Sequence, residues 1–221
     1  MKALLGQALA ILDAEPAITG WSLGGGTVLM LRHRHRVSRG VEIFLPDAQT
    51  LDGLKARLQN QPCVAEPGAL RVYLAEGEID FIVSRALTTP SVRKEKLLGR
   101  SLWVQTSAEI VAQKLWHRAA RFSARDLADF AIVARRERRA LAQLEPVIAA
   151  RRATLLDRLE RHEAALREDF AALDVLELSA SFDECLALVR KHLERGDRAE
   201  QPAAGYVAGC FLRGFALAGA G

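Results

Sequence analysis

The chain has 221 residues, of which 50% are hydrophobic and 26% are charged. This composition is typical of a globular protein and excludes a largely disordered one, and the length allows one large domain or a compact pair. The formal net charge is +4 and the pI is near 9.2. Such a modest excess permits attraction to polyanions such as nucleic acids without requiring it.

The cysteines and the two ends of the chain indicate a reduced, cytoplasmic location. Cys63, Cys185 and Cys210 are odd in number and lack metal-type spacing, so no disulfide framework is expected. Residues 1–12 form an apolar stripe with acidic residues directly after it, which favours an amphipathic helix over a signal peptide. Residues 203–221 are apolar but rich in glycine, so we expect a packed or loosely ordered terminal helix and no membrane partner.

The first part of the chain alternates between helical and extended patterns. Apolar residues recur every three to four positions in the helical segments and every second position in the extended ones. The expected elements are helix 2–12, strand 20–23, helix 27–31, strand 41–45, helix 51–59, and strands 69–75, 78–84 and 100–105. These strands predict one mixed sheet with helices packed against it.

From residue 106 onward the pattern is almost entirely helical. The expected helices are 108–119, 124–137, a long charged stretch at 145–173, and 182–193, with 196–204 as a late linker. The predicted fold class is therefore α+β, with a mixed sheet flanked by helices and then a helical C-terminal half. We expect an α/β domain at 1–105 and a helical domain at 106–221, with a binding cleft that the helical domain completes.

A glycine turn at Gly24, Gly25 and Gly26 follows the strand at 20–23 and precedes a helix. Glycines let backbone N–H groups approach a triphosphate closely, and a helix N-terminus favours an anion. On the following strand, Gly40 and Glu42 stand at alternate positions, which share one face. Two carboxylates at such positions can hold one cation together, but Gly40 supplies none.

Asp80 is the strongest single acidic candidate on the next strands. It stands in the otherwise apolar run Ile79-Asp80-Phe81-Ile82, where an isolated charge is costly to bury. Glu42 and Asp80 are therefore the predicted metal ligands. In the helical half, Lys114 and Arg118 are four residues apart on one helix face, so both can point at phosphates from the same side.

These segments resemble the AbiEii/AbiGii-type nucleotidyltransferases, a family that includes toxins of bacterial toxin–antitoxin and abortive-infection systems. The resemblance covers roughly residues 15–135. The segments that carry it are Gly25-Gly26-Thr27, Arg36-x-Ser38, Ile43-Phe44, Ile79-Asp80-Phe81, Lys114-Leu115 and Arg125-Asp126-Leu127-Ala128-Asp129. The chain departs from the family pattern at Gly40, which stands for the first Asp, and at Glu42, which stands for the second.

The resemblance implies a nucleotidyltransferase that moves a nucleotide from an NTP to an RNA hydroxyl, such as a tRNA end. It also implies Mg²⁺ or Mn²⁺ as the cofactor and a cognate antitoxin as a partner. The implied catalytic residues are Glu42, Asp80 and Asp126, with Asp126 as the partner of Lys114 or as a base. The implied nucleotide-binding residues are Gly25, Gly26, Thr27, Ser38, Lys114 and Arg118. The alternative role for Lys114, Asp126 and Asp129 is a salt-bridge network that joins helix to helix.

Basic residues gather in three places. The segment 32–36 alternates Arg and His, and Arg118, Arg121 and Arg125 recur on the predicted helices; both groups should flank the cleft. Residues 135–139 read as a solvated helix face. His33 and His35 lack the spacing of a metal site and are expected at the surface or in contact with RNA, and His117 is expected to be structural.

Three functional hypotheses remain open at this stage. The first is the nucleotidyltransferase, weakened because Gly40 supplies no metal ligand. The second is a catalytically inactive relative that binds a nucleotide, RNA or a protein, and Gly40 favours this one. The third is an interaction protein whose long helices after Ala140 pair with another chain.

Overall fold

A computed structural model describes residues 1–200 of the chain, with side chains described up to residue 194. Its centre is a seven-stranded mixed sheet with the strand order β3-β4-β5-β2-β1-β7-β6. The strands are β1 (Ser22–Gly24), β2 (Gly40–Leu45), β3 (Cys63–Glu66), β4 (Ala69–Leu74), β5 (Gly77–Val83), β6 (Val92–Leu97) and β7 (Arg100–Gln105).

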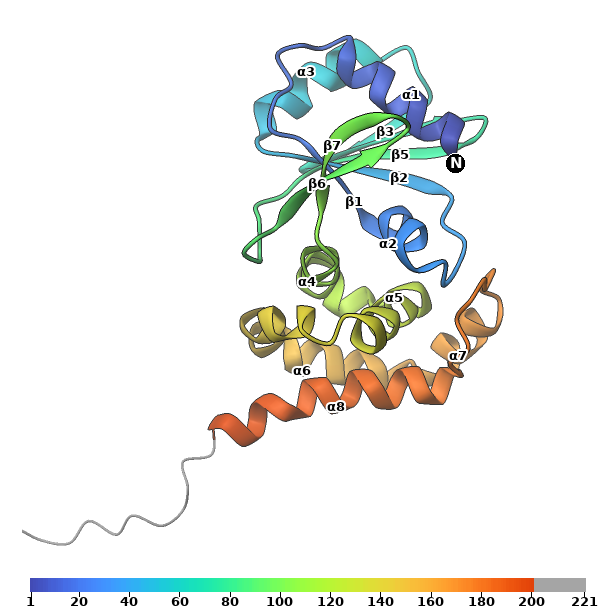
Figure 1. Cartoon of the computed structure of the whole chain (residues 1–221), viewed down its shortest axis with the longest axis vertical. Coiled ribbons are helices and arrows are strands. Elements are labelled where there is room, and N and C mark those ends of the chain that lie inside the picture. The colour runs from blue at the N-terminus through green and yellow to red at the C-terminus, as the bar shows by residue number, and fades with distance from the viewer. Residues whose placement is uncertain (201–221) are drawn as a thin grey trace, which may run out of the picture.

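Helices cover both faces of this sheet (Figure 1). The helices are α1 (Lys2–Asp13), α2 (Gly25–His33), α3 (Ala48–Leu58), α4 (Ser107–Arg118), α5 (Ala124–Arg136), α6 (Glu145–Arg161), α7 (Glu163–Ala171) and α8 (Phe182–Glu200). Two short 3-10 helices, Ala119–Arg121 and Ala140–Leu144, connect α4 to α5 and lead into α6. Helices α1 and α3 pack on one face of β2 and β5, while α2 packs against β1, β2 and β7 from the other side.

The strands pair so that residues far apart in sequence share one face of the sheet. Strand β2 runs antiparallel to β1 and parallel to β5, and β5 runs antiparallel to β4. The residues of β2 that face α1 and α3, such as Val41, Ile43 and Leu45, are buried in one hydrophobic core. The opposite face carries the polar residues described below, because successive side chains of a strand point to opposite sides.

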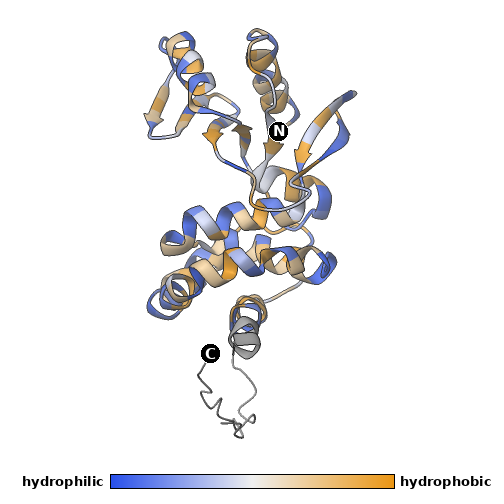
Figure 2. Ribbon diagram, turned by 90° about the vertical axis from the view of Figure 1, so that its left-hand side faces the viewer, coloured by the Kyte–Doolittle hydropathy of each residue, from blue (hydrophilic) through white to orange (hydrophobic). Residues whose placement is uncertain are grey.

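The helical part packs as a layered group in which α4 and α5 contact α2, and α6 and α8 lie beyond them (Figure 1). Each helix carries hydrophobic and hydrophilic residues around its circumference, as expected for helices with one buried side (Figure 2). The start of α5 is fixed by a capping box, in which Ser123 and Asp126 exchange side-chain and backbone hydrogen bonds.

The predicted fold class is confirmed, and most predicted elements are present with shifted ends. Strands β3 and β6 were not predicted. Both lie at the edges of the sheet, where one side of the strand has no neighbour, and the alternation of apolar residues is weak because little is buried there.

The helical half differs from the prediction at two points. The stretch expected as one helix at 145–173 divides at His162, whose φ of −120° and ψ of 20° leave the helical region. The linker expected at 196–204 is helical up to Glu200, because α8 continues through Gly196 and the ~1 kcal/mol helix penalty of one glycine does not end a helix packed on α5 and α6.

The expected terminal helix at 203–221 and Cys210 lie outside the described residues. In the part of the chain that the structure describes, no helix has the length and apolar character needed to cross a bilayer.

Candidate functional site

One row of residues crosses the sheet on the face that looks toward the helical part. Gly24 of β1 pairs with Glu42 of β2, Glu42 pairs with Asp80 of β5, and Asp80 pairs with Arg71 of β4. Directly opposed residues in a sheet share a face and lie close together. The register therefore places the two predicted metal ligands, Glu42 and Asp80, side by side.

The glycine turn holds the carboxylate of Glu42. The backbone N–H of Gly26 lies 3.5 Å from Glu42 Oε1. Gly25 has a φ of 73°, and a side chain there would place its Cβ 2.2 Å from Glu42 Cδ. Glycine suits this position, because the positive φ is strained for other residues and a Cβ would force the Glu42 carboxylate to move. The positive N-terminus of α2 is thus formed as an anion site and faces an acidic side chain.

Asp80 is joined to Arg71, a residue that the sequence analysis did not single out. Arg71 Nε lies 2.7 Å from Asp80 Oδ1, and the guanidinium also donates to Oδ2 at 3.3 Å. The Asp80 side chain is 17% exposed and that of Arg71 is 43% exposed. Burial raises the pKa of Asp80, and the Arg71 charge offsets this only in part.

Glu78 occupies the space next to Gly40. The two residues are directly opposed on β5 and β2, and a Cβ on Gly40 would lie 3.2 Å from Glu78 Cγ. Glu78 and Asp80 are two positions apart on one strand, the same spacing that was sought at positions 40 and 42. That spacing was visible in the sequence, but its relation to Gly40 depends on the strand register.

Glu42 and Asp80 provide carboxylate oxygens of the kind that a divalent cation takes as ligands. Within the described residues, no group of three acidic, histidine or cysteine side chains is arranged to hold a metal ion. Mg²⁺ is commonly held by one or two carboxylates together with substrate phosphates. The neighbouring pair Glu42 and Asp80 meets that requirement for a single ion, and Gly40 leaves the second set of ligands incomplete.

A cleft of about 610 Å³ lies over this row, and cationic side chains form its other wall. Its lining includes five residues of the sheet side and five residues of the helical side: Gly25, Glu42, Arg71, Asp80 and Gln105, and Lys114, His117, Arg118, Arg121 and Arg125. Arg118, Arg121 and Arg125 line the cleft as predicted, whereas the segment 32–36, which was also expected to flank it, contributes no residue to its lining. Acidic and basic walls that face each other can bind a polyanion together with a cation.

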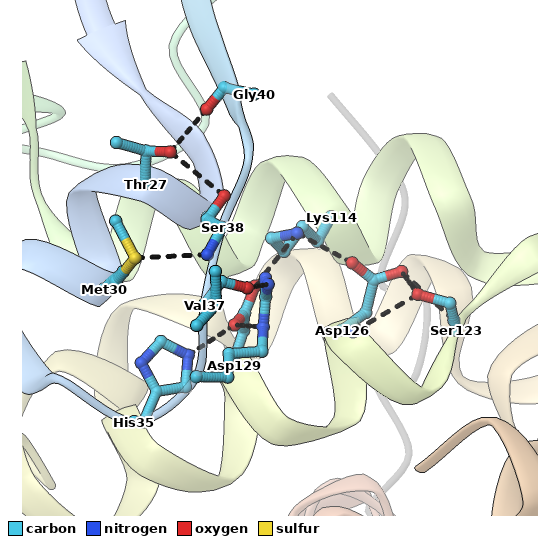
Figure 3. A network of polar contacts seen from close by, with 12 residues as sticks. Thr27, Met30, His35, Val37, Ser38, Gly40, Lys114, Ser123, Asp126 and Asp129 are labelled. Atoms are coloured by element: carbon cyan, nitrogen blue, oxygen red, sulfur yellow. Dashed lines mark hydrogen bonds and ion pairs between the residues drawn. The ribbon is translucent and has the colours of Figure 1, made fainter. Parts of the chain in front are cut away.

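Lys114 is bound to two carboxylates of α5 (Figure 3). Its Nζ lies 2.7 Å from Asp126 Oδ1 and 3.1 Å from Asp129 Oδ2. Burial alone would lower the pKa of Lys114, but the charges of Asp126 and Asp129 raise it above its ordinary value. The Arg118 guanidinium adds a contact to Asp126 at 3.2 Å. The lysine is therefore a permanently charged part of a helix-to-helix network.

Asp129 is the centre of that network. Its carboxylate accepts from Arg36 at 2.7 Å through both oxygens and contacts His35 Nε2 at 2.6 Å (Figure 3). Burial opposes its ionisation, but Arg36 and Lys114 hold the pKa of Asp129 well below its ordinary value. Asp126 also has a lowered pKa, because Lys114 and Arg118 outweigh the effect of burial. An acid of lowered pKa is a poor general base at neutral pH.

The basic segment at 32–36 does not form an open surface. His35 and Arg36 are buried on Asp129, His33 is paired with Glu137 at 2.9 Å, and Arg32 binds Glu95. The expectation of surface or RNA-contacting histidines was wrong. Each of these side chains has an acidic partner that comes from a distant element, so the local sequence gave no sign of burial.

Thr27 and Ser38 join the start of α2 to the segment before β2. The Thr27 hydroxyl lies 3.0 Å from Ser38 Oγ and donates to the carbonyl of Gly40 (Figure 3). Thr27 is buried. Of the predicted nucleotide-binding residues, the cleft is lined by Gly25, Lys114 and Arg118, while Gly26, Thr27 and Ser38 stand outside its lining. Asp126 also stands outside it, behind Lys114 and Arg118.

Comparison with solved structures identifies the fold. The chain is similar to MenT4, a nucleotidyltransferase toxin from Mycobacterium tuberculosis, with a TM-score of 0.53 and 19% identity over 91% of this chain and 85% of that one. It is also similar to the antibiotic-resistance factor ANT(2'')-Ia, with a TM-score of 0.52 and 14% identity over 74% of this chain and 97% of that one. No protein-family model matches the sequence, and no curated protein matches it either. The seven-stranded sheet with its flanking helices is therefore a nucleotidyltransferase fold.

Proposed function

We propose that this protein is a nucleotidyltransferase of the toxin type, which transfers a nucleotide from an NTP to a hydroxyl group of RNA such as a tRNA end. One observation carries the proposal. Glu42 and Asp80 lie in register on neighbouring strands, Glu42 contacts the glycine turn at the start of α2, and both residues line one cleft with Lys114 and Arg118. Similarity of fold to a toxin nucleotidyltransferase supports the same reaction class.

Each wall of the cleft has a separate part in binding the NTP. The backbone N–H groups at Gly25 and Gly26 bind phosphate oxygens once the Glu42 carboxylate turns away from them. Arg118 adds charge from α4, and Asp126 holds Arg118 and Lys114 in place. Glu42 and Asp80 would hold one Mg²⁺ or Mn²⁺ ion, which would neutralise phosphate charge.

A second candidate function is nucleotide binding without transfer. Two observations favour it. Gly40 supplies no carboxylate, and the Asp80 carboxylate is already bound by both nitrogens of the Arg71 fork. A cleft with these properties binds phosphates while holding the metal weakly. Transfer to a hydroxyl then proceeds slowly or not at all.

The deciding experiment compares the native chain with Gly40→Asp and Asp80→Asn. Each protein is incubated with total tRNA, Mg²⁺ or Mn²⁺, and each of the four labelled NTPs in turn. The proposal expects labelled RNA from the native chain and none from Asp80→Asn. Label produced only by Gly40→Asp supports the second candidate, and no label from any form, with NTP binding absent, contradicts both.

The toxin type brings two further proposals. We expect a cytoplasmic protein, consistent with cysteines that are free where the structure describes them. We also expect a cognate antitoxin. Induced expression of the native chain alone should arrest growth of the host cell, whereas Asp80→Asn should not; equal growth of the two strains contradicts the toxin role.

A further inference from the structure

A second cavity lies on the same face of the sheet, next to the cleft. Its volume is about 420 Å³, which is within the range of small-molecule sites. The two cavities share Phe44, Gln105 and Gln113. Ser22 and Phe44, which are directly opposed on β1 and β2, lie two residues along the strands from Gly24 and Glu42. Two strand residues span about 7 Å, so this cavity begins about that distance from the carboxylate row.

Aromatic rings form much of the cavity wall. Trp21, Phe44 and Trp103 all line it, and the Trp103 side chain on β7 is 48% exposed. The ring has Lys94 Nζ 5.1 Å from its centroid, and burial of the rest of its exposed area in a complex would be strongly favourable. Arg85 lines the same cavity, and a guanidinium can also stack on a flat ring.

Gln105 provides a hydrogen-bond acceptor that has no partner. The residue is 3% exposed, and its Oε1 atom makes no hydrogen bond in the described part of the chain. An unsatisfied buried amide is costly, so such atoms commonly meet a ligand. Gln105 lies beside the glycine turn, since a Cβ on Gly24 would lie 2.2 Å from this oxygen.

Several other polar groups around this cavity are already paired within the protein. The Glu109 carboxylate accepts from the backbone N–H groups of Leu87 and Thr88, and Gln113 Nε2 donates to Glu109 and to the carbonyl of Arg85. Ser84 Oγ donates to Gln113 Oε1 at 2.7 Å. The wall from Ser84 to Thr88 is thus held by hydrogen bonds, whereas the buried Gln105 amide oxygen has no hydrogen-bond partner in the described part of the chain.

We propose that this cavity binds a nucleobase, stacked on Trp103 and hydrogen-bonded through one of its N–H groups to Gln105 Oε1. The inference rests on the proposed function, since the neighbouring cleft would hold the phosphates of the same or an adjoining nucleotide. A nucleobase combines a flat aromatic ring, which can stack on Trp103, with an N–H donor, which can pair with the Gln105 oxygen. Base–aromatic stacking is tolerant of sequence. The base comes either from the NTP or from an unpaired nucleotide of the RNA.

Ligand-observed NMR titrations of the full chain test this proposal with adenosine and purine riboside, which differ by the amino donor. The native chain should bind adenosine several-fold more tightly than purine riboside. Gln105→Met should remove that difference, and Trp103→Ala should weaken both nucleosides by about tenfold. Trp103→Phe, which keeps a ring, should restore most of the binding and exclude misfolding as the cause.

Tyr73→Ala is the matched control, since Tyr73 is a strand aromatic that is 43% exposed and lines neither cavity. Its nucleoside affinity should equal that of the native chain. Equal affinity of native protein for adenosine and purine riboside, or binding that survives Trp103→Ala, overturns the proposal. Loss of binding in Tyr73→Ala to the same extent overturns it as well.

Inorganic tripolyphosphate separates this proposal from the proposed function. It should bind the native chain and Trp103→Ala equally, since Trp103 does not line the cleft. Tripolyphosphate binding without nucleoside binding overturns the base site and leaves the cleft proposal standing, and the reverse pattern overturns the cleft proposal alone. Parallel titrations with ATP and a single-stranded trinucleotide identify the source of the base, because only the ligand whose base enters the cavity loses affinity in Trp103→Ala.

Discussion

Two aspartates show how this molecule separates charges that hold the fold together from charges that are open to a ligand. Asp129 on α5 is fully buried and is bound by His35, Arg36 and Lys114. Asp80 on β5 is 17% exposed and is bound by Arg71, whose own side chain is 43% exposed. The first carboxylate has all its partners within the protein, whereas the second lines an open cleft.

The protonation of the two acids differs in the same way. The pKa of Asp129 is well below its ordinary value, because cations outweigh the cost of burial. The pKa of Asp80 is raised, because burial outweighs the effect of Arg71 and the weaker effect of Arg118. An additional cation near Asp80 would offset the cost of burying its charge, whereas the Asp129 carboxylate is already paired with Arg36 and Lys114. Residue type alone therefore does not distinguish an aspartate that stabilises the fold from one that lines the cleft.

The largest effect should follow from Asp129→Asn. This change leaves Arg36 and Lys114 buried with one neutral partner in place of a carboxylate, and breaking a buried pair in this way costs about 3–5 kcal/mol. Urea denaturation followed by circular dichroism measures the loss. Asp174→Asn, which breaks the exposed pair with Arg39, is the control and should leave the urea midpoint nearly unchanged.

Lys114→Met should be milder. Asp126 keeps Arg118 and Asp129 keeps Arg36, so each carboxylate retains one cation and the loss should be about 1–3 kcal/mol. The same variant should bind tripolyphosphate almost as well as the native chain if Lys114 belongs mainly to the network. A stable Lys114→Met protein that has lost phosphate binding would instead show that the lysine contacts the ligand.

Acidification should affect the two aspartates with opposite sign. The lowered pKa of Asp129 stabilises the fold above the ordinary Asp value and that contribution is lost as the pH falls below about 4. The raised pKa of Asp80 costs stability at neutral pH, and protonation relieves this cost as the pH falls. Urea midpoints measured from pH 7 to pH 3 should therefore show that the disadvantage of Asp129→Asn begins to shrink below about pH 4, while Asp80→Asn loses a small advantage.

Glu137 extends this test to a carboxylate of intermediate exposure. Its hydrogen bond from His33 lowers its pKa to about 2, so its contribution is present above pH 4.5 and fades as the pH falls toward 2. Glu137→Gln should destabilise the fold at pH 7 and less so at pH 3. A pH-independent difference would show that the pair does not change protonation on unfolding.

The smallest effect on stability should come from Arg71→Gln, under about 1 kcal/mol because the pair is partly exposed. The effect of Arg71→Gln on the affinity for Mn²⁺ should be easier to detect than its effect on stability. Removal of the fixed cation leaves Asp80 and Glu42 as an uncompensated pair, so Mn²⁺ should bind more tightly in the presence of NTP. Calorimetric titration with Mn²⁺ checks this, and unchanged affinity would show that Arg71 does not compete with the metal.

Local sequence patterns determined the fold class, the glycine turn and the candidates Glu42 and Asp80. Alternating apolar residues mark the central strands β2 and β5, because both of their neighbours are present and one face is fully buried. The edge strands β3 and β6 were not predicted, because each has a neighbour on one side only and little of it is buried. The turn was evident because consecutive glycines before a helix indicate a tight backbone conformation or a close backbone approach.

Only the tertiary structure decided which charges meet. Arg36 and Asp129 are 93 residues apart in the chain, and Arg71 reaches Asp80 only because β4 and β5 pair in one particular register. Glu78 lies over Gly40, and Gln105 lies over Gly24, for the same reason. Periodicity reports which face a residue occupies, whereas contacts between elements depend on how those faces are placed together. The sequence therefore supplied the candidate residues, and the packing of sheet against helices determined which of them bind each other and which face the cleft.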